Sequence, residues 1–187
     1  MGRRPVRSLL RNCVLSVALL LALAPAASAG DIDDYAYDHA HGCRKHPQPG
    51  MLAMERWLEH HAKGESWGIM RCEKLSGDSY SLHAEGRALD WRLNAHDSSE
   101  RREAQRLIRL FLKRDRHGNN HARARRMGIQ ELIFNCRSWW AGDGGMEPYS
   151  ACEHGHVDDS TAHRNHIHIG LNWRGARMKT TFWRGRR

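Results

Sequence analysis

Residues 81–93 read SLHAEGRALDWRL, a turn followed by a strand pattern. From Ala88 to Leu93 the side chains alternate in character, and the apolar positions are Leu89, Trp91 and Leu93. If these three enter the core, Asp90 points to the opposite, more open face of the sheet. Gly86 permits a turn between this strand and His83. The pattern therefore predicts a strand that presents a carboxylate, with a histidine close to its start.

A second strand pattern lies near the end of the chain, over His166–Trp173. Its alternating positions are Ile167, Ile169 and Leu171 on one side and His166, His168 and Gly170 on the other. Because residues two apart in a strand share a face, His166 and His168 point the same way. These imidazoles can therefore converge with Asp90 and His83.

Histidines that meet a carboxylate suggest metal chemistry. Two histidines and one carboxylate leave a tetrahedral metal with a fourth position for water, which is the arrangement of a catalytic zinc site. Zinc lowers the pKa of that water to about 7 and polarises a bound carbonyl, so the site suits amide hydrolysis. The alternative is that Asp90 caps a turn and that the histidines are surface or hydrogen-bonded polar residues. Several candidates fall on one predicted face, which favours a Zn²⁺ site.

The other patterns predict helices mixed with strands. Met51–Ala62 has apolar residues at helical spacing, and a longer amphipathic helix follows the capping residues 97–100. A short helix through Arg126 would end at Gly128, and Ile129–Phe134 has a strand pattern. Since helices and strands do not alternate regularly, we predict an α+β domain with a small, mostly antiparallel sheet and flanking helices.

Residues 1–29 have the features of a signal peptide. A basic start is followed by an apolar run, Val14–Leu23, and then by the small residues Ala27-Ser28-Ala29. We expect cleavage at that point, export to the cell envelope, and a single domain over residues 30–187 whose segment 30–49 is loosely attached. The apolar run is too short for a permanent membrane anchor. An uncleaved anchor helix is the alternative.

Charge argues against a nucleic-acid partner. The chain carries 30 Lys and Arg against 21 Asp and Glu, a formal charge of +9. Removal of the signal peptide takes away four arginines and no acid, which leaves +5 and suits an anionic cell wall. We therefore expect no nucleic acid among the partners. A chain of 187 residues is too short for two full domains, and we expect a monomer.

The cysteines predict disulfides. Cys13 lies in the signal peptide, so four cysteines remain in the exported chain. An even number in an oxidising compartment indicates two disulfides, with three possible connectivities. We favour Cys43–Cys72 and Cys136–Cys152, because each pair closes a modest loop. The alternative is a secreted cysteine peptidase, in which a catalytic thiol would leave one cysteine without a partner.

Two motifs resemble those of the zinc D-alanyl-D-alanine peptidases, the M15-type enzymes of the Hedgehog/DD-peptidase fold. Residues 81–90 match the signature S-x-H-x-x-G-x-A-x-D, and His166-Ile167-His168 matches the H-x-H near the end of such domains. Arg71-Cys72 also resembles an arginine-containing segment of extensin-like relatives. The resemblance covers about Met51 to Trp173 and implies the same fold.

The resemblance implies a role for each matching residue. The Zn²⁺ ligands would be His83, Asp90 and His168. His166 would hydrogen-bond the water or the transition state, and Arg71 would hold a substrate carboxylate or carbonyl. Ser81 would steady a ligand or a substrate group, or would simply form a turn. The implied activity is that of a secreted zinc peptidase that hydrolyses amide bonds in bacterial peptidoglycan peptides, as a D-Ala-D-Ala carboxypeptidase or an endopeptidase.

One position departs from the family pattern. Many members place a catalytic Glu three residues before the last zinc ligand, where this chain has Asn165, and Asn cannot accept a proton at neutral pH. We favour His166 as the general base; an acid from the loop Glu153–Asp159 is the alternative. If neither acts, the protein is a non-catalytic metal-binding or wall-binding protein of the same fold.

Three further features have weaker interpretations. Trp139-Trp140 and the glycines after them indicate a loop beside the cleft. Glu85 occupies a variable position of the signature and is expected on the surface. The loop before the last strand is rich in histidine, and we assign no role to His154, His156 and His163.

Overall fold

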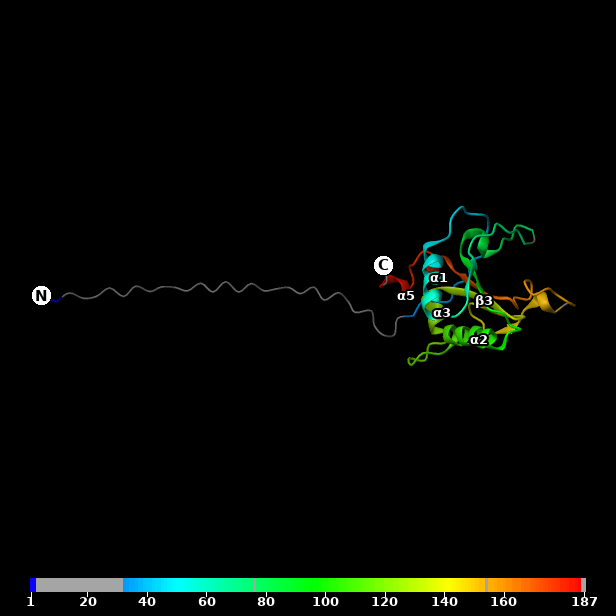
Figure 1. The fold of residues 1–187 in the computed structure, drawn as a ribbon. Coiled ribbons are helices and arrows are strands. Elements are labelled where there is room, and N and C mark those ends of the chain that lie inside the picture. The colour runs from blue at the N-terminus through cyan, green and yellow to red at the C-terminus, as the bar shows by residue number, and fades with distance from the viewer. Residues whose placement is uncertain (3–31, 76, 154, 186–187) are drawn as a thin grey trace.

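The computed structural model describes residues 1–2, 32–75, 77–153 and 155–185. They form an α+β fold around a six-stranded sheet in which neighbouring strands are antiparallel (Figure 1). The strand order is β1-β2-β6-β3-β4-β5. The bounds are Glu65–Gly68 (β1), Ala88–Arg92 (β2), Ile129–Phe134 (β3), Arg137–Trp140 (β4), Glu147–Pro148 (β5) and His166–Leu171 (β6). The predicted α+β class and antiparallel sheet are confirmed.

Two longer helices and several short ones complete the fold. The predicted helices near residues 51–62 and after residue 97 are present, and α2 begins where the Asp97 side chain accepts hydrogen bonds from the backbone N–H groups of Ser99 and Glu100. The α-helices are α1 (Pro49–His61), α2 (Ser98–Leu112), α3 (Ala122–Met127), α4 (Trp173–Ala176) and α5 (Thr181–Arg184). The 3₁₀ turns are η1 (Leu82–Glu85) and η2 (Ser150–Cys152).

The main core lies between the helices α1 and α2 and one face of the sheet (Figure 1). The strands contribute the fully or almost fully buried side chains of Leu89, Trp91, Leu132, Ile167 and Ile169. The helices contribute Met51, Met54, Leu58, Leu107 and Phe111, all with no exposed area. The period-two alternation predicted for β2 and β6 therefore sends their apolar residues into this core.

The alternate residues of the same strands gather on the opposite face. Asp90 of β2 lies directly across from His168 of β6, and Ile133 of β3 lies across from His168 on its other side. Arg92 pairs in the same way with His166. The antiparallel register thus aligns the carboxylate and the two imidazoles that the sequence places on one face.

The segment of Trp139 and Trp140 is a strand, and the prediction of a loop was wrong. In β4, Trp139 lies opposite Leu132 of β3 and is fully buried in the core. Burial of a large aromatic ring together with ladder hydrogen bonds outweighs the turn tendency of the following glycines, which begin only after the strand ends. Trp140 points the other way and lines the pocket described below.

Glu85 is buried, and the prediction that it lies on the surface was wrong. Its carboxylate forms an ion pair of 2.7 Å with Arg87, whose side chain has no exposed area. Glu85 also accepts a hydrogen bond from the backbone N–H of His41, and Arg87 donates one to the carbonyl of Leu171. A variable position in a motif can therefore still be buried, because here the chain segment before α1 covers it.

The segment 30–49, which we expected to be loosely attached, makes specific contacts with the rest of the domain over its described residues 32–48. Asp33 is buried and accepts hydrogen bonds from the backbone N–H and the hydroxyl of Thr181, at 2.8 and 2.6 Å. The carboxylate of Asp38 accepts a hydrogen bond of 2.7 Å from the backbone N–H of Trp173. The sequence alone could not indicate these contacts, because the partners lie more than 130 residues further along the chain.

Two disulfides join the predicted pairs, Cys43–Cys72 and Cys136–Cys152, with Cα atoms 5.4 and 5.7 Å apart. All four cysteines after residue 29 are therefore bonded, and none of them is a free thiol nucleophile. Such bonds fit an extracellular protein. In the part of the chain that the structure describes, no helix is both long and apolar enough to cross a bilayer. The predicted signal peptide lies outside the described residues, apart from Met1 and Gly2.

Candidate metal centre

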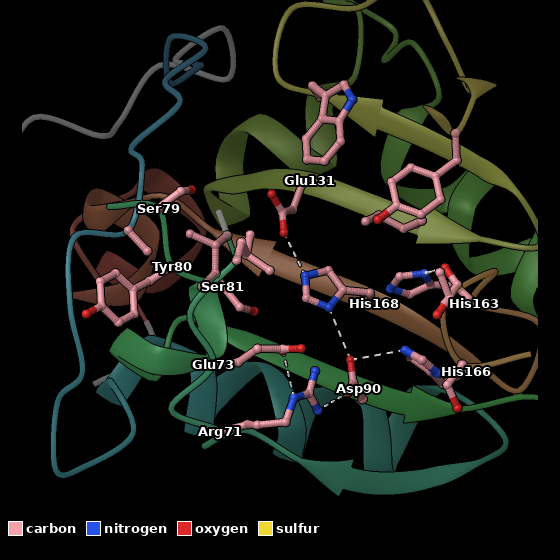
Figure 2. A pocket seen from close by; sticks show the side chains of 18 of the residues that line it. Arg71, Glu73, Ser79, Tyr80, Ser81, Asp90, Glu131, His163, His166 and His168 are labelled. Atoms are coloured by element: carbon pink, nitrogen blue, oxygen red, sulfur yellow. Dashed lines mark hydrogen bonds and ion pairs between the residues drawn. The ribbon is translucent and has the colours of Figure 1, made fainter. Parts of the chain in front are cut away.

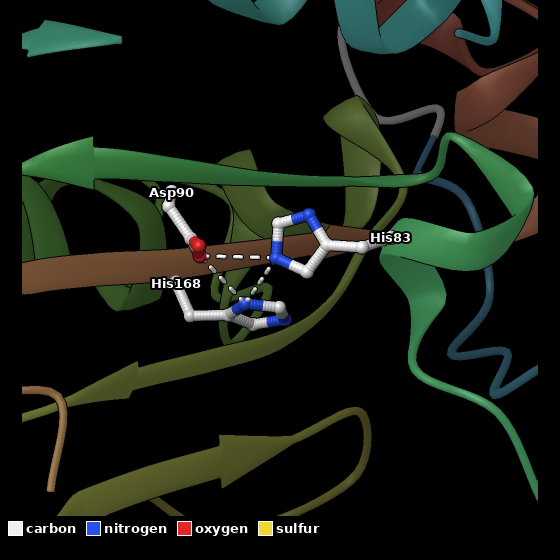
Figure 3. Close-up of side chains that lie close together, drawn as sticks. All are labelled: His83, Asp90 and His168. Carbon is white, nitrogen blue, oxygen red and sulfur yellow. Dashed lines mark hydrogen bonds and ion pairs between the residues drawn. The ribbon is translucent and has the colours of Figure 1, made fainter. Parts of the chain in front are cut away.

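His83, Asp90 and His168 meet at one point on the open face of the sheet (Figure 3). Nε2 of His83 lies 3.0 Å from Oδ1 of Asp90, and Nδ1 of His168 lies 3.1 Å from the same oxygen. The two ring nitrogens are 3.2 Å apart. Ligand atoms of a tetrahedral zinc ion would be about 3.3 Å apart, as its bond lengths of about 2.0–2.2 Å require. The group could hold a metal ion.

The turn η1 sets the direction of the His83 ring. Ser81 caps this turn by accepting a hydrogen bond from the backbone N–H of His83, and Gly86 closes it with φ of 68°, a conformation that glycine adopts without strain. Nδ1 of His83 lies 2.8 Å from the carbonyl oxygen of Ile69. A carbonyl only accepts, so Nδ1 carries a proton and Nε2 faces Asp90, where it would offer its lone pair to a metal when the ring is neutral.

His168 is oriented by a carboxylate that the sequence analysis did not select. Nε2 of His168 lies 2.6 Å from Oε1 of Glu131 on β3, so Nε2 donates and Nδ1 faces the centre (Figure 2). Burial lowers the pKa of His168, but hydrogen bonds and charge from Asp90 and Glu131 outweigh it and raise the pKa to about 9. A proton or another cation is therefore strongly favoured among these groups.

Asp90 uses its two oxygens differently. Oδ1 faces the two imidazoles, and Oδ2 accepts a hydrogen bond of 3.0 Å from Nη1 of Arg71. Burial alone would raise the pKa of Asp90, but hydrogen bonds with His168 and His83 hold it well below its usual value. Arg71 also donates from Nε to Glu73, again at 3.0 Å. The guanidinium therefore lies beside the centre with its charge already shared by two carboxylates.

His166 lies next to the three candidate ligands and is oriented by the unusual Asn165. Nδ1 of His166 is 2.7 Å from Oδ1 of Asn165, and Nε2 is 3.4 Å from Oδ1 of Asp90. An amide oxygen only accepts, so Nδ1 donates and the Nε2 lone pair faces the centre. Burial, partly opposed by Asp90, lowers the pKa of His166 to about 4. The ring is therefore neutral at pH 7.

His163 packs against this ring at a tilt of 48°, although the sequence analysis assigned it no role. Its centroid lies 4.6 Å from that of His166 and 5.6 Å from that of His168. Burial and the neighbouring imidazoles lower the pKa of His163 to about 3. The described part of the loop Glu153–Asp159 supplies no acid to the centre, because none of Glu153, Asp158 and Asp159 lines the pocket beside it. Asp158 accepts hydrogen bonds from backbone N–H groups of its own loop, and Asp159 pairs with His96 and Arg164.

A comparison with protein families gives a match over most of this domain. The family described as VldE, C-terminal domain, matches residues 43–167, about two thirds of the chain. The chain belongs to this family. The match to the VldE C-terminal domain includes His83 and Asp90 and ends one residue before His168. Comparison with curated proteins and with solved structures gives no match.

The centre of this VldE-family domain opens into a pocket of about 660 Å³ (Figure 2). A pocket of this size can hold several residues of a peptide. Asp90, Glu131, His166 and His168 line it, and its walls are rich in aromatic residues, namely Tyr37, Trp67, Tyr80, Trp140 and Tyr149. The Trp67 side chain is about half exposed, with 51% of its area accessible. The pocket therefore combines polar groups at the metal centre with apolar surfaces around it.

Each predicted site residue is found at or beside this centre. Arg71 and Ser81 line the pocket together with the imidazoles (Figure 2). The sequence analysis missed two glutamates. Glu131 hydrogen-bonds the candidate ligand His168, and Glu73 pairs with Arg71. Glu131 could have been found as the one acid of the apolar strand Ile129–Phe134, whereas Glu73 lies in a loop with no such pattern.

Proposed function

We propose that this domain is an exported zinc peptidase that hydrolyses amide bonds in peptidoglycan peptides. The observation that carries the proposal is the buried group of His83, Asp90 and His168, whose ligand atoms lie within 4.8 Å of one another, at the wall of a peptide-sized pocket that Asp90 and His168 line. Two nitrogens and one carboxylate oxygen form the ligand set of catalytic zinc sites. A bound zinc ion would supply Lewis acidity and lower the pKa of a coordinated water to about 7.

His166 is the residue that we assign to proton transfer. Its Nε2 lone pair faces the centre, 3.4 Å from Oδ1 of Asp90, and Asn165 holds the tautomer. It can therefore take a proton from the attacking water and later give it to the leaving amine, as general acid–base catalysis requires. Asn165 then acts through His166, and the missing glutamate of the resembling family is not needed for this step.

Arg71 is the residue that we assign to the carbonyl oxygen of the scissile amide. Its guanidinium is shared between Asp90 and Glu73, but donors on Nη1 and Nη2 remain for a developing negative charge. Among the described residues that line the pocket, Arg71 is the only Lys or Arg. Because its charge is balanced, the site favours an amide within a peptide over a bond next to a free terminal carboxylate. This supports an endopeptidase.

The remaining features are consistent with a protein that acts on the cell wall. Two disulfides, the signal-peptide pattern and a charge of +5 after its removal all suit a protein that works outside the membrane near an anionic wall. The S-x-H-x-x-G-x-A-x-D signature supports the Hedgehog/DD-peptidase fold and the M15-type relationship. The aromatic walls of the pocket suit a peptide in which some residues have no large charged group.

Mass spectrometry of digested peptidoglycan tests this function. The purified exported protein, loaded with zinc, should release new peptide fragments from isolated peptidoglycan. A chelator and the substitution His168→Ala should each abolish release, whereas His96→Ala should not, because His96 is an exposed histidine outside the pocket. A zinc-loaded protein that cleaves no wall peptide would refute the peptidase assignment.

A non-catalytic metal-binding or wall-binding protein is the second candidate. Asn165 favours it, because an amide stands where the resembling family has its catalytic glutamate. This candidate predicts that the zinc-loaded protein sediments with peptidoglycan and leaves every peptide intact.

A further inference from the structure

Glu131 is the buried acid nearest to the candidate ligands that is not itself one of them. Its side chain is almost fully buried, and its Oε1 accepts the 2.6 Å hydrogen bond from Nε2 of His168 (Figure 2). We propose that Glu131 is a positioning residue of the metal centre, which fixes His168 with Nδ1 toward the metal and is itself held by Tyr37. The inference deepens the proposed function and rests on its metal centre, not on its substrate.

The hydrogen bond determines which nitrogen of His168 is available. An imidazole has one donor and one acceptor nitrogen when neutral, and the carboxylate of Glu131 binds the donor at Nε2. Once the ring is neutral, as metal binding requires, the lone pair of Nδ1 is directed at the point between Asp90 and His83. A carboxylate on the remote nitrogen also makes the ligating nitrogen more basic, and loss of such a partner typically weakens metal binding about 10–100-fold.

The backbone around Glu131 is shaped to aim this side chain. The register of β3 with β6 shifts between Ile129 and Glu131, and such irregularities redirect side chains. Glu131 then lies opposite Gly170, where a Cβ would come within 2.5 Å of Cγ of Glu131 and of Cδ1 of Leu82. Glycine at this position therefore leaves room for the glutamate to lean over β6 toward His168.

Tyr37 hydrogen-bonds the second oxygen of the Glu131 carboxylate. Its hydroxyl donates a hydrogen bond of 3.2 Å to Oε2 of Glu131, while its ring packs edge-on against Trp140. Tyr37 belongs to the segment before α1 that is tied down through Asp33 and Asp38. Both carboxylate oxygens thus have a donor, so that Glu131 has little freedom to turn away from His168.

Metal affinity and the spectrum of bound Co²⁺ test the proposal without any substrate. We expect Glu131→Ala to weaken Zn²⁺ binding about 10–100-fold in competition with a chromophoric chelator. Glu131→Gln keeps an acceptor without the charge and should lose less, and Tyr37→Phe should lose least. The matched substitution Glu147→Gln, on the exposed strand β5, should leave the affinity unchanged. Folded variants are then compared at equal Co²⁺ content. Under that condition the Co²⁺ absorption bands should shift in Glu131→Ala and in none of the other variants.

Two results would overturn the inference. Wild-type affinity and an unchanged Co²⁺ spectrum in Glu131→Ala would show that His168 needs no such partner. If Glu131→Ala does not fold, unchanged affinity in both Glu131→Gln and Gly170→Ala would contradict it equally. A wild-type protein that binds metal but cleaves no peptide would remove the peptidase and leave this inference standing.

Discussion

Strands β2 and β6 contribute successive residues to two different environments. Leu89 and Ile167 pack beneath α1 and α2, where size and shape decide what fits. Asp90 and His168, one residue further along each strand, meet charged and hydrogen-bonding partners on the opposite face. The core face is held by many interchangeable apolar contacts, whereas the site face depends on a few directed bonds. Substitutions on the two faces should therefore damage different properties.

The largest effect is expected on the site face. His166→Ala removes the assigned base and should lower kcat for peptide cleavage by about 10²–10⁴-fold, which is the usual contribution of general acid–base catalysis. Zinc content should stay at the wild-type level, because His166 is not one of the candidate ligands. The assay is steady-state cleavage of a soluble wall peptide beside metal analysis. Loss of zinc together with activity would show that His166 is a ligand instead.

Substitutions on the core face should lower the stability of the fold. Leu89→Ala removes a fully buried side chain and should lower the free energy of unfolding by about 2–5 kcal/mol, since a cavity forms beside Trp91 and Ile169. The same change at Leu75, which is 60% exposed, should cost less than about 0.5 kcal/mol. Denaturant unfolding measures both. Folded Leu89→Ala should keep its zinc affinity, and a large loss of affinity would mean that the two faces are not separable.

A smaller effect on the metal-free protein should appear as pH changes. The folded-state pKa values of His163 and His166 are lowered to about 3 and 4, so below pH 6.5 the unfolded state binds more protons and stability falls as the pH falls. The pKa of His168 is raised to about 9, so its contribution is complete below pH 6.5 and is lost as the pH rises to 9. Stability should therefore peak near pH 6.5.

Thermal unfolding of chelator-treated protein between pH 4 and 9.5 checks this profile. His168→Ala should flatten the alkaline side and leave the acidic side in place. Stability that keeps rising from pH 6.5 to 9 in the metal-free wild type would contradict the account of His168.

The smallest effect is expected when the charge at the C-terminus of a peptide substrate is removed. Because Arg71 is balanced by Asp90 and Glu73, amidation of the terminal carboxylate of a peptide substrate should change kcat/KM by less than about threefold. Mass spectrometry of matched free and amidated peptides gives the ratio. Loss of cleavage upon amidation would instead indicate a carboxypeptidase and a carboxylate-binding role for Arg71.

The sequence predicted the elements well because their patterns are local. The strand Ile129–Phe134 has the predicted bounds, and the alternation in β2 assigned Leu89 and Asp90 to the correct faces. It could not predict that Glu131 meets His168, since that contact depends on the register between strands far apart in the chain. Trp139 was assigned to a loop for the same reason: its strand partner and its burial come from tertiary packing.

Metal analysis of the purified protein tests the central claim most directly. If His83, Asp90 and His168 form a zinc site, the wild type should carry about one zinc ion per chain at neutral pH. His83→Ala and His168→Ala, with unchanged folding by circular dichroism, should carry almost none. A folded wild-type protein that takes up no zinc when zinc is supplied, or variants that hold as much as the wild type, would contradict the account.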